Sequence, residues 1–377
     1  MRPVARLDGL GTTIFTEMTA LAARTGAINL GQGFPDTDGP DSVIEAAVAA
    51  LRGGENQYAP LPGVPALREA VLAHQRDYYG LEPEDLLVTF GATEAIAAAL
   101  LALCEAGDEV VVLEPYYDSY AACISFAGAR RRPVTLRPPD FLLDADALRA
   151  SIGPRARVLL LNSPHNPTGR VLSRKELSTI ADACVEHDLV CISDEVYEHL
   201  VYDGEHIPPA TLPGMAERTL TVSSVGKSFS VTGWKIGWCS GPAGLVAATR
   251  TVKQYLTFAG GTPLQHAAGA ALTDARAYLA GLRDELRAKR DQLRAGLDAA
   301  GLRPLHSAGT YFVNADVGSD AVSFCRTLPE RCGVVAIPTG AFYDDTTAAP
   351  TLVRFAFCKR EATIAEAAER LASLRSK

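Results

Sequence analysis

The chain has 377 residues, of which 47% are hydrophobic and 21% are charged, and its formal net charge is -8. This composition is typical of a folded globular protein with room for about two or three compact units, and unlike that of disordered or fibrous chains. The negative charge disfavours a dedicated nucleic-acid binder, because phosphate affinity depends on clustered Lys and Arg.

The chain shows no targeting or membrane signal. Residues Met1–Asp8 contain no apolar run of signal-peptide length, and no segment has the roughly 20 apolar residues that span a bilayer. The eight cysteines, from Cys104 to Cys358, form no CxxC pair and no cluster with metal-ligand spacing. We therefore expect a cytoplasmic protein with reduced core thiols and no bound metal.

Between about Leu86 and Ser240, short β-rich runs alternate with helical stretches. Continuous apolar strands separated by helices indicate a mainly parallel sheet covered on both faces, so we predict an α/β fold. In such sheets ligands bind beyond the carboxyl ends of the strands, and the polar motifs of this chain follow directly after these runs. The predicted strands are Leu87–Phe90, Val110–Leu113, Val158–Leu161, Val190–Ser193 and Thr219–Val222.

The pattern changes near Ala275, where leucines recur at helical spacing among charges and predict a long amphipathic helix. Strand-like runs at Tyr311–Val313 and Leu352–Phe355 follow, and then a closing helix near Ile364–Leu374. We expect a large domain over residues 30–275 and a smaller α+β domain formed by residues 1–29 and 276–377.

Two motifs lie directly after predicted strands. The first, Gly91-Ala92-Thr93, opens a helix, so its backbone N–H groups and the threonine hydroxyl are suited to an anion such as phosphate. The second contains Lys227, which has glycine and serine neighbours and precedes another cation, Lys235, set between two tryptophans. A lysine amine, with a pKa of about 10.4, must be desolvated or placed near cations to attack an aldehyde.

At the Lys227 segment the sequence resembles the fold type I aminotransferases of class I/II, and the resemblance extends over almost the whole chain. Asn162–Gly169, Asp194–Tyr197 and Leu352–Phe355 are similar to the family's other motifs. The resemblance implies a mainly parallel sheet of about seven strands and pyridoxal 5'-phosphate as cofactor. Lys227 would bind the cofactor covalently as a Schiff base and then act as the general base.

The resemblance also assigns roles to other side chains. Asp194 would keep the cofactor's pyridine nitrogen protonated, which makes the ring an electron sink. Asn166 and Tyr197 would hydrogen-bond the phenolic oxygen, and Arg354, with Asn166, would bind the substrate α-carboxylate through two parallel hydrogen bonds. The other expected cofactor contacts are Gly91, Ala92, Thr93, Ser224 and Lys235 at the phosphate and Tyr117 stacked on the ring. Much of the family has arginine in place of Lys235.

Two further segments resemble a subgroup. Gly31–Asp36 and Asn56–Tyr58 are similar to the kynurenine aminotransferase and glutamine transaminase K type, and to the actinobacterial N-succinyldiaminopimelate aminotransferase type. In these enzymes the tyrosine that corresponds to Tyr58 reaches the cofactor phosphate of the neighbouring subunit. The resemblance therefore implies a homodimer with shared active sites.

The loop Phe258–Pro263 contains no arginine, whereas aspartate-specific relatives place one there. We therefore expect an open pocket lined by Gly33, Phe15, Phe34 and Tyr116 that favours a long or bulky amino donor, with 2-oxoglutarate as acceptor. N-succinyl-LL-diaminopimelate is the leading candidate. Kynurenine, glutamine, methionine and aromatic amino acids are alternatives, as is β-lyase chemistry on the same cofactor.

Three other classes of function have weaker support. Ser224–Lys227 fits the SxxK pattern of serine acyl enzymes, but the accompanying elements are absent. Gly31-Gln32-Gly33 could begin a dinucleotide-binding turn, yet Pro35 and Asp36 stand where a helix should follow. A catalytically silent regulator that binds the cofactor would need a DNA-binding extension. Visible absorbance that amino donors bleach would separate an active aminotransferase from all three.

Overall fold

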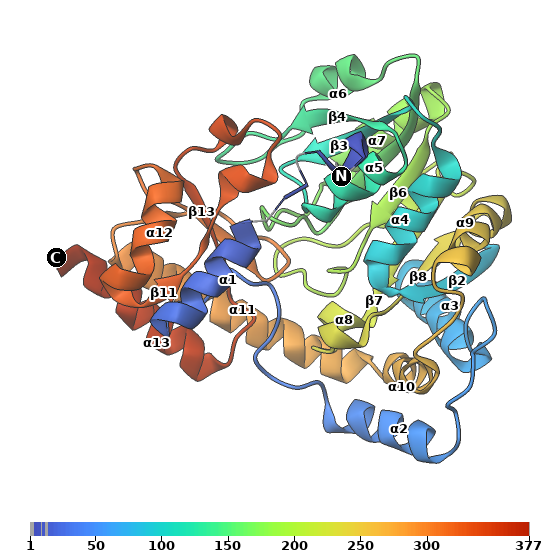
Figure 1. Cartoon of the computed structure of the whole chain (residues 1–377), viewed down its shortest axis with the longest axis horizontal. Coiled ribbons are helices and arrows are strands. Elements are labelled where there is room, and N and C mark those ends of the chain that lie inside the picture. The colour runs from blue at the N-terminus through green and yellow to red at the C-terminus, as the bar shows by residue number, and fades with distance from the viewer. Residues whose placement is uncertain (1–3, 9, 12–13, 377) are drawn as a thin grey trace.

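A seven-stranded sheet forms the centre of the larger lobe in the computed structural model of the chain, which describes residues 4–8, 10–11 and 14–376 (Figure 1). The strand order is β2-β8-β7-β6-β5-β3-β4. Strand β8 runs opposite to the other six strands, which all point the same way. The predicted mainly parallel α/β sheet is therefore confirmed. The strands are β2 Asp85–Phe90, β3 Glu109–Glu114, β4 Arg130–Thr135, β5 Ala156–Asn162, β6 Val190–Asp194, β7 Thr219–Ser224 and β8 Ile236–Gly241.

Helices cover both faces of this sheet, which explains the continuous apolar runs of Val110–Leu113 in β3 and Val158–Leu161 in β5. One face packs against α4 Gly91–Leu103, α5 Ser119–Phe126 and α9 Ala243–Leu256. The opposite face packs against α3 Pro65–Tyr79, α6 Ala145–Ser151, α7 Arg174–Glu186 and α10 Thr262–Thr273. Helix α2, Asp41–Arg52, lies outside α10, and the short α8, Val225–Ser228, follows β7.

The smaller lobe is built on a four-stranded antiparallel sheet in the order β12-β13-β10-β9. A two-stranded parallel pair, β1 and β11, lies beside it. The predicted long helix, the two predicted strands and the closing helix are all present. The elements are β1 Ile28–Asn29, β9 Arg303–Pro304, β10 Phe312–Asp316, β11 Val334–Val335, β12 Ile337–Pro338, β13 Leu352–Ala356, α1 Ile14–Thr25, α11 Arg276–Ala299, α12 Ala321–Cys332 and α13 Glu361–Ala372.

Short 3-10 helices connect these elements: η1 Ala5–Leu7, η2 Pro209–Thr211, η3 Thr232–Trp234, η4 Thr339–Phe342, η5 Thr346–Ala348 and η6 Ser373–Ser376. No helix in the described ranges combines the length and the apolarity that crossing a bilayer requires. Seven of the eight cysteines are buried, and Cys332 is partly exposed.

The N-terminal helix α1 packs with the C-terminal lobe. Met18 on α1 shares one apolar core with Leu293 on α11 and Leu371 on α13. We propose that residues 1–29 and 276–377 form the small domain and residues 30–275 the large one, because the change of core falls near these positions. Residues 1–3, 9, 12–13 and 377 lie outside the described residues.

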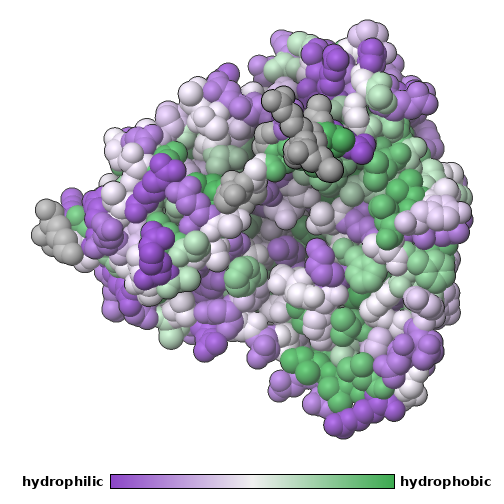
Figure 2. All heavy atoms as spheres, viewed as in Figure 1, coloured by the Kyte–Doolittle hydropathy of each residue, from purple (hydrophilic) through white to green (hydrophobic). Residues whose placement is uncertain are grey.

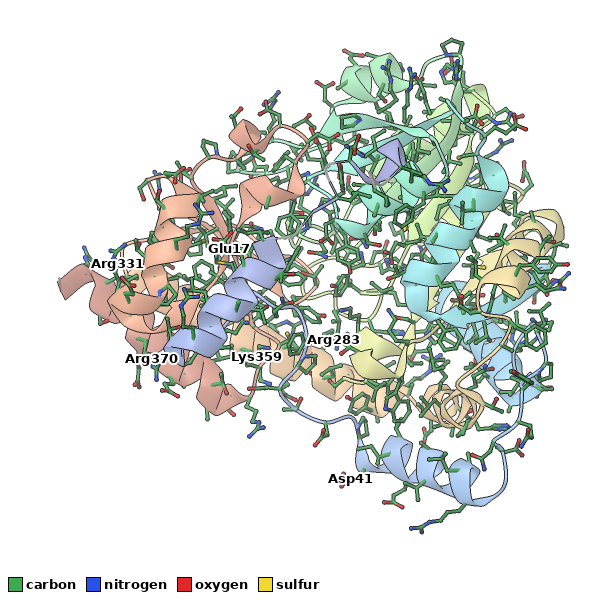
Figure 3. The ribbon with its side chains drawn as sticks, in the orientation of Figure 1. Glu17, Asp41, Arg283, Arg331, Lys359 and Arg370 are labelled. Atoms are coloured by element: carbon green, nitrogen blue, oxygen red, sulfur yellow. The ribbon has the colours of Figure 1, made fainter. Side chains whose placement is uncertain are left out.

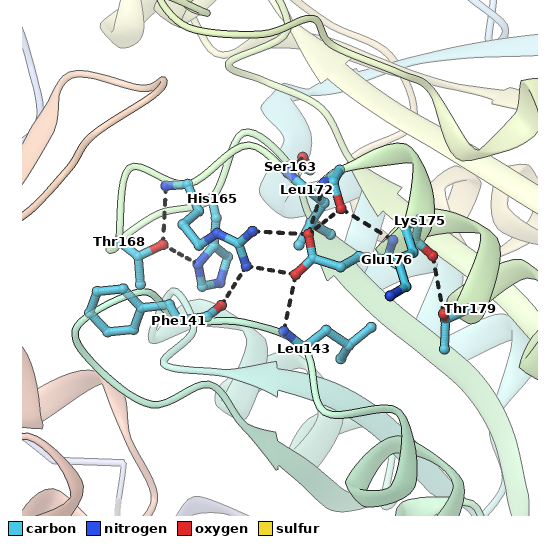
Figure 4. Close-up of polar contacts among 11 residues, drawn as sticks. Phe141, Leu143, Ser163, His165, Thr168, Leu172, Lys175, Glu176 and Thr179 are labelled. Carbon is cyan, nitrogen blue, oxygen red and sulfur yellow. Dashed lines mark hydrogen bonds and ion pairs between the residues drawn. The ribbon is translucent and has the colours of Figure 1, made fainter.

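A buried ion pair holds the turn that follows β5 (Figure 4). Arg170 donates to both carboxylate oxygens of Glu176, at 2.7 and 2.9 Å, and the backbone N–H groups of Leu143 and Ser173 donate to the same carboxylate. Ser173 and Glu176 also form a capping box at the start of α7. Burial alone would raise the pKa of Glu176, but these hydrogen bonds outweigh it and lower the pKa to about 2.

We expect Glu176→Gln to lower the free energy of unfolding at pH 7 by about 2–4 kcal/mol, because it leaves the Arg170 guanidinium buried without its anion. The Glu176 pKa is lower in the folded protein than the ordinary 4.5, so this stabilisation is present above about pH 5 and is lost as the pH falls towards 2. Urea unfolding at several pH values measures both effects. A variant as stable as wild type at pH 7 would contradict this account.

Candidate active site

A cavity of about 420 Å³ lies between the two lobes, at the carboxyl ends of β5, β6 and β7, and Figure 2 shows the surface hollowed there. Asn162, Asp194 and Ser224 end these three strands, and each lines the cavity. Neighbouring parallel strands present their carboxyl ends at one sheet edge, which is why motifs far apart in the sequence meet. The sequence-predicted residues that line the cavity are Phe15, Gly33, Phe34, Gly91, Ala92, Thr93, Tyr117, Asn166, Asp194, Tyr197, Ser224, Lys227, Lys235 and Arg354.

Two predicted residues do not line the cavity. Tyr116 is buried, with its ring packed in a core of the large lobe and its hydroxyl donating to Asp344. Tyr116 therefore does not line the cavity, because adjacent residues of this turn point in different directions and Tyr117 takes the cavity side; its expected contact with substrate stays a prediction. Tyr58 lies on the surface, with an exposed fraction of 81%.

Lys227 lies on the short helix α8, directly after the buried strand β7. Its Nζ donates to the carbonyl oxygen of Gly33 at 3.3 Å and lies 5.8 Å from the ring centre of Tyr197. Burial lowers the pKa of the Lys227 ammonium to about 8; Asp194 opposes this shift and Lys235 adds to it. Near pH 8 about half of the amines are therefore neutral and nucleophilic.

Asp194 ends β6 and is 5% exposed. One carboxylate oxygen accepts a hydrogen bond of 2.5 Å from the hydroxyl of Tyr120, and the other accepts from the backbone N–H of Val196 at 3.3 Å. Burial raises the pKa of Asp194 to about 6, although the Tyr120 bond opposes this shift. Asp194 is therefore a buried carboxylate at neutral pH, held in one orientation.

Arg354, on β13 of the smaller lobe, is a buried cation in the lining of the cavity. Its guanidinium donates to Asn166 Oδ1 and to the carbonyl oxygen of Gly31, both at 2.8 Å, and it stacks 4.0 Å from the ring centre of Phe312. Burial lowers the pKa of Arg354 to about 10, so the group stays charged at neutral pH. Its Nε is buried without a hydrogen-bond partner among the described residues, which suits it to an incoming carboxylate.

The start of α4 forms a cradle for an anion. A Cβ on Gly91 would lie 3.2 Å from Lys235 Nζ, and one on Gly237 would lie 2.7 Å from the Gly91 carbonyl carbon. Gly91 also has a φ of +72°, which side chains rarely adopt. Only glycine at these two positions lets the first N–H groups of the helix come so close to an ammonium group. With Thr93 and Ser224 beside them, this site could hold a phosphate.

Residues 31–36 cross the mouth of the cavity and are held mainly by their backbone, with further bonds to the side chains of Gln32 and Asp36. Beyond the bond from Arg354 to Gly31, the carbonyl oxygen of Gly33 accepts from the hydroxyl of Tyr311, and Lys359 donates to that of Phe34 at 2.6 Å. Arg360 donates through Nε and Nη2 to the carbonyl oxygen of Asp36 at 3.0 and 2.9 Å. Lys359, labelled in Figure 3, belongs to the smaller lobe, so this lobe positions the segment.

Sequence reasoning missed three supporting residues. Tyr120 orients Asp194, and Asn162 donates to the Asp194 carbonyl oxygen at 2.8 Å while its Oδ1 accepts from the backbone N–H of Asn166 at 2.8 Å. Lys359 holds the mouth segment. Tyr120 lies three residues after Tyr117, its backbone N–H donates to the Tyr117 carbonyl oxygen at the start of α5, and this spacing is the signal that could have identified it.

Residues 25–371 match the family described as aminotransferase class I and II. Over 389 residues the chain is 52% identical to the Mycobacterium tuberculosis protein named Probable N-succinyldiaminopimelate aminotransferase, with 98% of each chain covered. It is 42% identical to the methionine aminotransferase of Escherichia coli, covering 99% of this chain and 98% of that one. The solved structure of N-succinyldiaminopimelate aminotransferase from M. tuberculosis covers 99% of this chain and 100% of its own, with a TM-score of 0.97.

Proposed function

Because the chain belongs to the class I and II aminotransferases, we propose that it uses pyridoxal 5'-phosphate to move the amino group of a long-chain or bulky α-amino acid to a 2-oxo acid. The observation that carries this proposal is one cavity that holds a partly buried amine, Lys227, a buried carboxylate, Asp194, and a buried guanidinium, Arg354. We place the enzyme in the cytoplasm, where its buried thiols stay reduced.

The cavity suits pyridoxal phosphate, which when bound supplies an aldehyde for an amine and an electron sink for proton transfer. The phosphate would lie at the start of α4, against Gly91–Thr93, Ser224 and Lys235. Asp194 would hold the ring nitrogen and keep it protonated. Tyr117 would stack on the ring. Asn166 accepts from Arg354 through Oδ1, so its amide NH₂ is left to donate to the phenolic oxygen together with Tyr197.

The remaining residues act on the substrate. Arg354 would bind its α-carboxylate through two parallel hydrogen bonds, which fixes the α-carbon relative to Lys227. The pKa of Lys227, about 8, is well below that of an ordinary lysine, so near pH 8 about half of the side chains carry the free amine that a general base needs. Phe15, Phe34 and the Gly33 backbone lie at the mouth, where the donor side chain would extend.

We propose N-succinyl-LL-diaminopimelate as the leading amino donor and 2-oxoglutarate as acceptor. The relative with 52% identity over the whole chain supports this choice, and the loop Phe258–Pro263 lacks the arginine that an aspartate side chain would need. Methionine, kynurenine, glutamine and aromatic amino acids are the alternatives, and the E. coli methionine aminotransferase favours the first of them. The same site could also support β-elimination.

A donor-by-acceptor screen tests the substrate. We expect long or aromatic donors to exceed aspartate by at least about tenfold in kcat/KM, since the open pocket offers no partner for a short carboxylate. The screen should include N-succinyl-LL-diaminopimelate, methionine, kynurenine and aspartate, each with 2-oxoglutarate. If aspartate is the best donor, the assignment of the pocket is wrong while the aminotransferase reaction stands.

We further propose a homodimer in which Tyr58 reaches the cofactor phosphate of the partner subunit. Tyr58 packs edge-on against Phe258 with ring centres 5.5 Å apart, although their exposed fractions are 81% and 40%. Tyr255 and Leu256, at the end of α9 and close to Phe258 in the chain, are also exposed, by 81% and 54%. An exposed patch of this kind is typical of an interface.

We expect Tyr58→Phe to keep the dimer and to weaken cofactor retention by about tenfold, the cost of losing one hydrogen bond to a charged group. Sedimentation gives the oligomeric state, and dialysis followed by cofactor absorbance gives retention. Tyr255→Phe, on the same surface, is the control and should retain cofactor as wild type does. A fully active monomer would exclude shared sites.

A further inference from the structure

Behind the turn that carries Asp194 and Tyr197 lies a second cluster of titratable side chains. Asp194 and Tyr197 line the cavity, whereas the alternate residues Glu195 and Glu198 do not. Both glutamates are buried, Glu198 next to His74 on α3 and Glu195 next to His206. The reaction described above uses none of these four residues.

The side chains of His74, Glu198 and His199 bring together atoms that can bind a metal ion. His74 Nε2 lies 2.8 Å from His199 Nε2 and 4.0 Å from Glu198 Oε2. The ligand atoms of His74, Glu198 and His199 all lie within 4.8 Å of one another. At 2.8 Å one Nε2 donates a hydrogen bond to the other, and replacing the shared proton by a metal ion would make the lone pairs of both nitrogens available as ligands.

The charge of the cluster is unbalanced. The side chains of His74 and Glu198 are 1% and 7% exposed, and among the described residues no Lys or Arg forms an ion pair with Glu195 or Glu198. Two buried carboxylates that lack a lysine or arginine partner in the described part of the chain call for another cation.

We propose that His74 Nε2, His199 Nε2 and Glu198 Oε2 bind one Zn²⁺ ion. Imidazole nitrogens with one carboxylate oxygen are a donor set that zinc prefers, whereas Mg²⁺ and Ca²⁺ prefer oxygen alone. At Zn–N distances of about 2.1 Å two ligand nitrogens stand roughly 3.4 Å apart, so the rings would separate by about 0.6 Å. His199 is only partly buried, so its ring can shift and a water molecule can take the fourth position.

The surroundings fit an ion at this place. The other carboxylate oxygen of Glu198 accepts a hydrogen bond of 2.5 Å from the hydroxyl of Ser223, which would orient the ligand. Ser223 and Glu198 belong to the two segments that supply Ser224 and Tyr197 to the cavity. The ion would thus connect α3 to the back of the active site and act as a structural support.

The test uses untagged enzyme with its cofactor bound. After chelator treatment and dialysis, the protein is titrated with Co²⁺, whose d–d bands lie at longer wavelengths than the cofactor absorbs, and then with Zn²⁺ in competition. We expect one ion per chain by elemental analysis, Co²⁺ bands typical of four-coordination, displacement by Zn²⁺ and none by Mg²⁺ or Ca²⁺. If wild-type enzyme binds neither Co²⁺ nor Zn²⁺ stoichiometrically, the proposal is wrong.

Variants assign the ligands. We expect His199→Gln and Glu198→Gln each to weaken Co²⁺ binding by at least about tenfold and to abolish the rise in Tm that Zn²⁺ gives wild type. His206→Gln is the matched control, because His206 is buried in the same region but hydrogen-bonds to Glu195 at 2.7 Å, and it should bind Co²⁺ as wild type does. Equal Co²⁺ affinity in wild type and His199→Gln would overturn the assignment.

Discussion

Lys227→Ala is expected to reduce transamination by about 10,000-fold or more, because one amine both binds the proposed cofactor and moves the proton. No neighbouring side chain can replace it. Lys235, the other lysine of the cavity, lies over Gly91 at the proposed phosphate site. The variant should still bind pyridoxal phosphate through the phosphate contacts, but the absorbance of the bound cofactor should lose its dependence on pH.

Steady-state assays and pH-dependent absorbance spectra measure both effects. Lys175→Ala, at an exposed position on α7, is the control and should match wild type in both. Exogenous small amines that partly restore turnover would show that the missing group is an amine and that the fold is intact. A Lys227→Ala enzyme with near wild-type turnover would overturn the proposed site.

Asp194→Asn is expected to lower kcat by about 100- to 1,000-fold, the usual cost of removing a preorganised charge from an active site. The amide has nearly the shape of the carboxylate and can still accept from Tyr120, so the loss reports charge and not packing. Without a carboxylate the proposed ring nitrogen loses its proton, and the ring withdraws electrons less strongly. Cofactor binding should weaken much less than kcat.

Glu195→Gln provides the comparison, since it removes the adjacent buried carboxylate, which bonds to His206 and does not face the cavity. Its kcat should remain within about threefold of wild type, as expected for a residue that does not line the cavity. Thermal unfolding of both variants separates catalytic loss from destabilisation. If Asp194→Asn lowers kcat by less than about threefold, Asp194 is not the partner of the ring nitrogen.

The sequence was sufficient for the strands whose side chains are buried on both faces, because their apolar runs are continuous. It did not reveal β4, Arg130–Thr135, an edge strand that carries three arginines and Pro133. An edge strand leaves one set of backbone groups unpaired and faces solvent, so its sequence lacks the apolar run. Strand β8, Ile236–Gly241, was hidden because glycines and serine interrupt its apolar pattern.

The candidate site was predictable for residues that stand in a recognisable motif, as Lys227, Asp194 and Arg354 do. The similarity to the family's motifs identified these residues, and all three line the cavity. The resemblance did not reveal the contacts that orient Asp194. The hydroxyl of Tyr120 donates to the Asp194 carboxylate and Asn162 donates to the Asp194 carbonyl oxygen, and both bonds join segments far apart in the chain. For the same reason it did not show that Tyr116 points away from the cavity, towards Asp344.

The way residues 31–36 are anchored has a consequence for how such an enzyme could diversify. The smaller lobe holds this segment by its carbonyl oxygens, at Gly31, Gly33, Phe34 and Asp36, and a carbonyl oxygen is the same whatever side chain is attached. Replacing Phe34 therefore alters the chemistry of the pocket mouth while these anchors stay in place. Two neighbouring positions are less free to change. Gln32 also donates through its side chain to the hydroxyl of Thr19 at 2.7 Å, and a Cβ on Gly33 would lie 2.4 Å from the Phe312 ring. Substrate preference can thus drift through single substitutions at Phe34, without a compensating change in the scaffold.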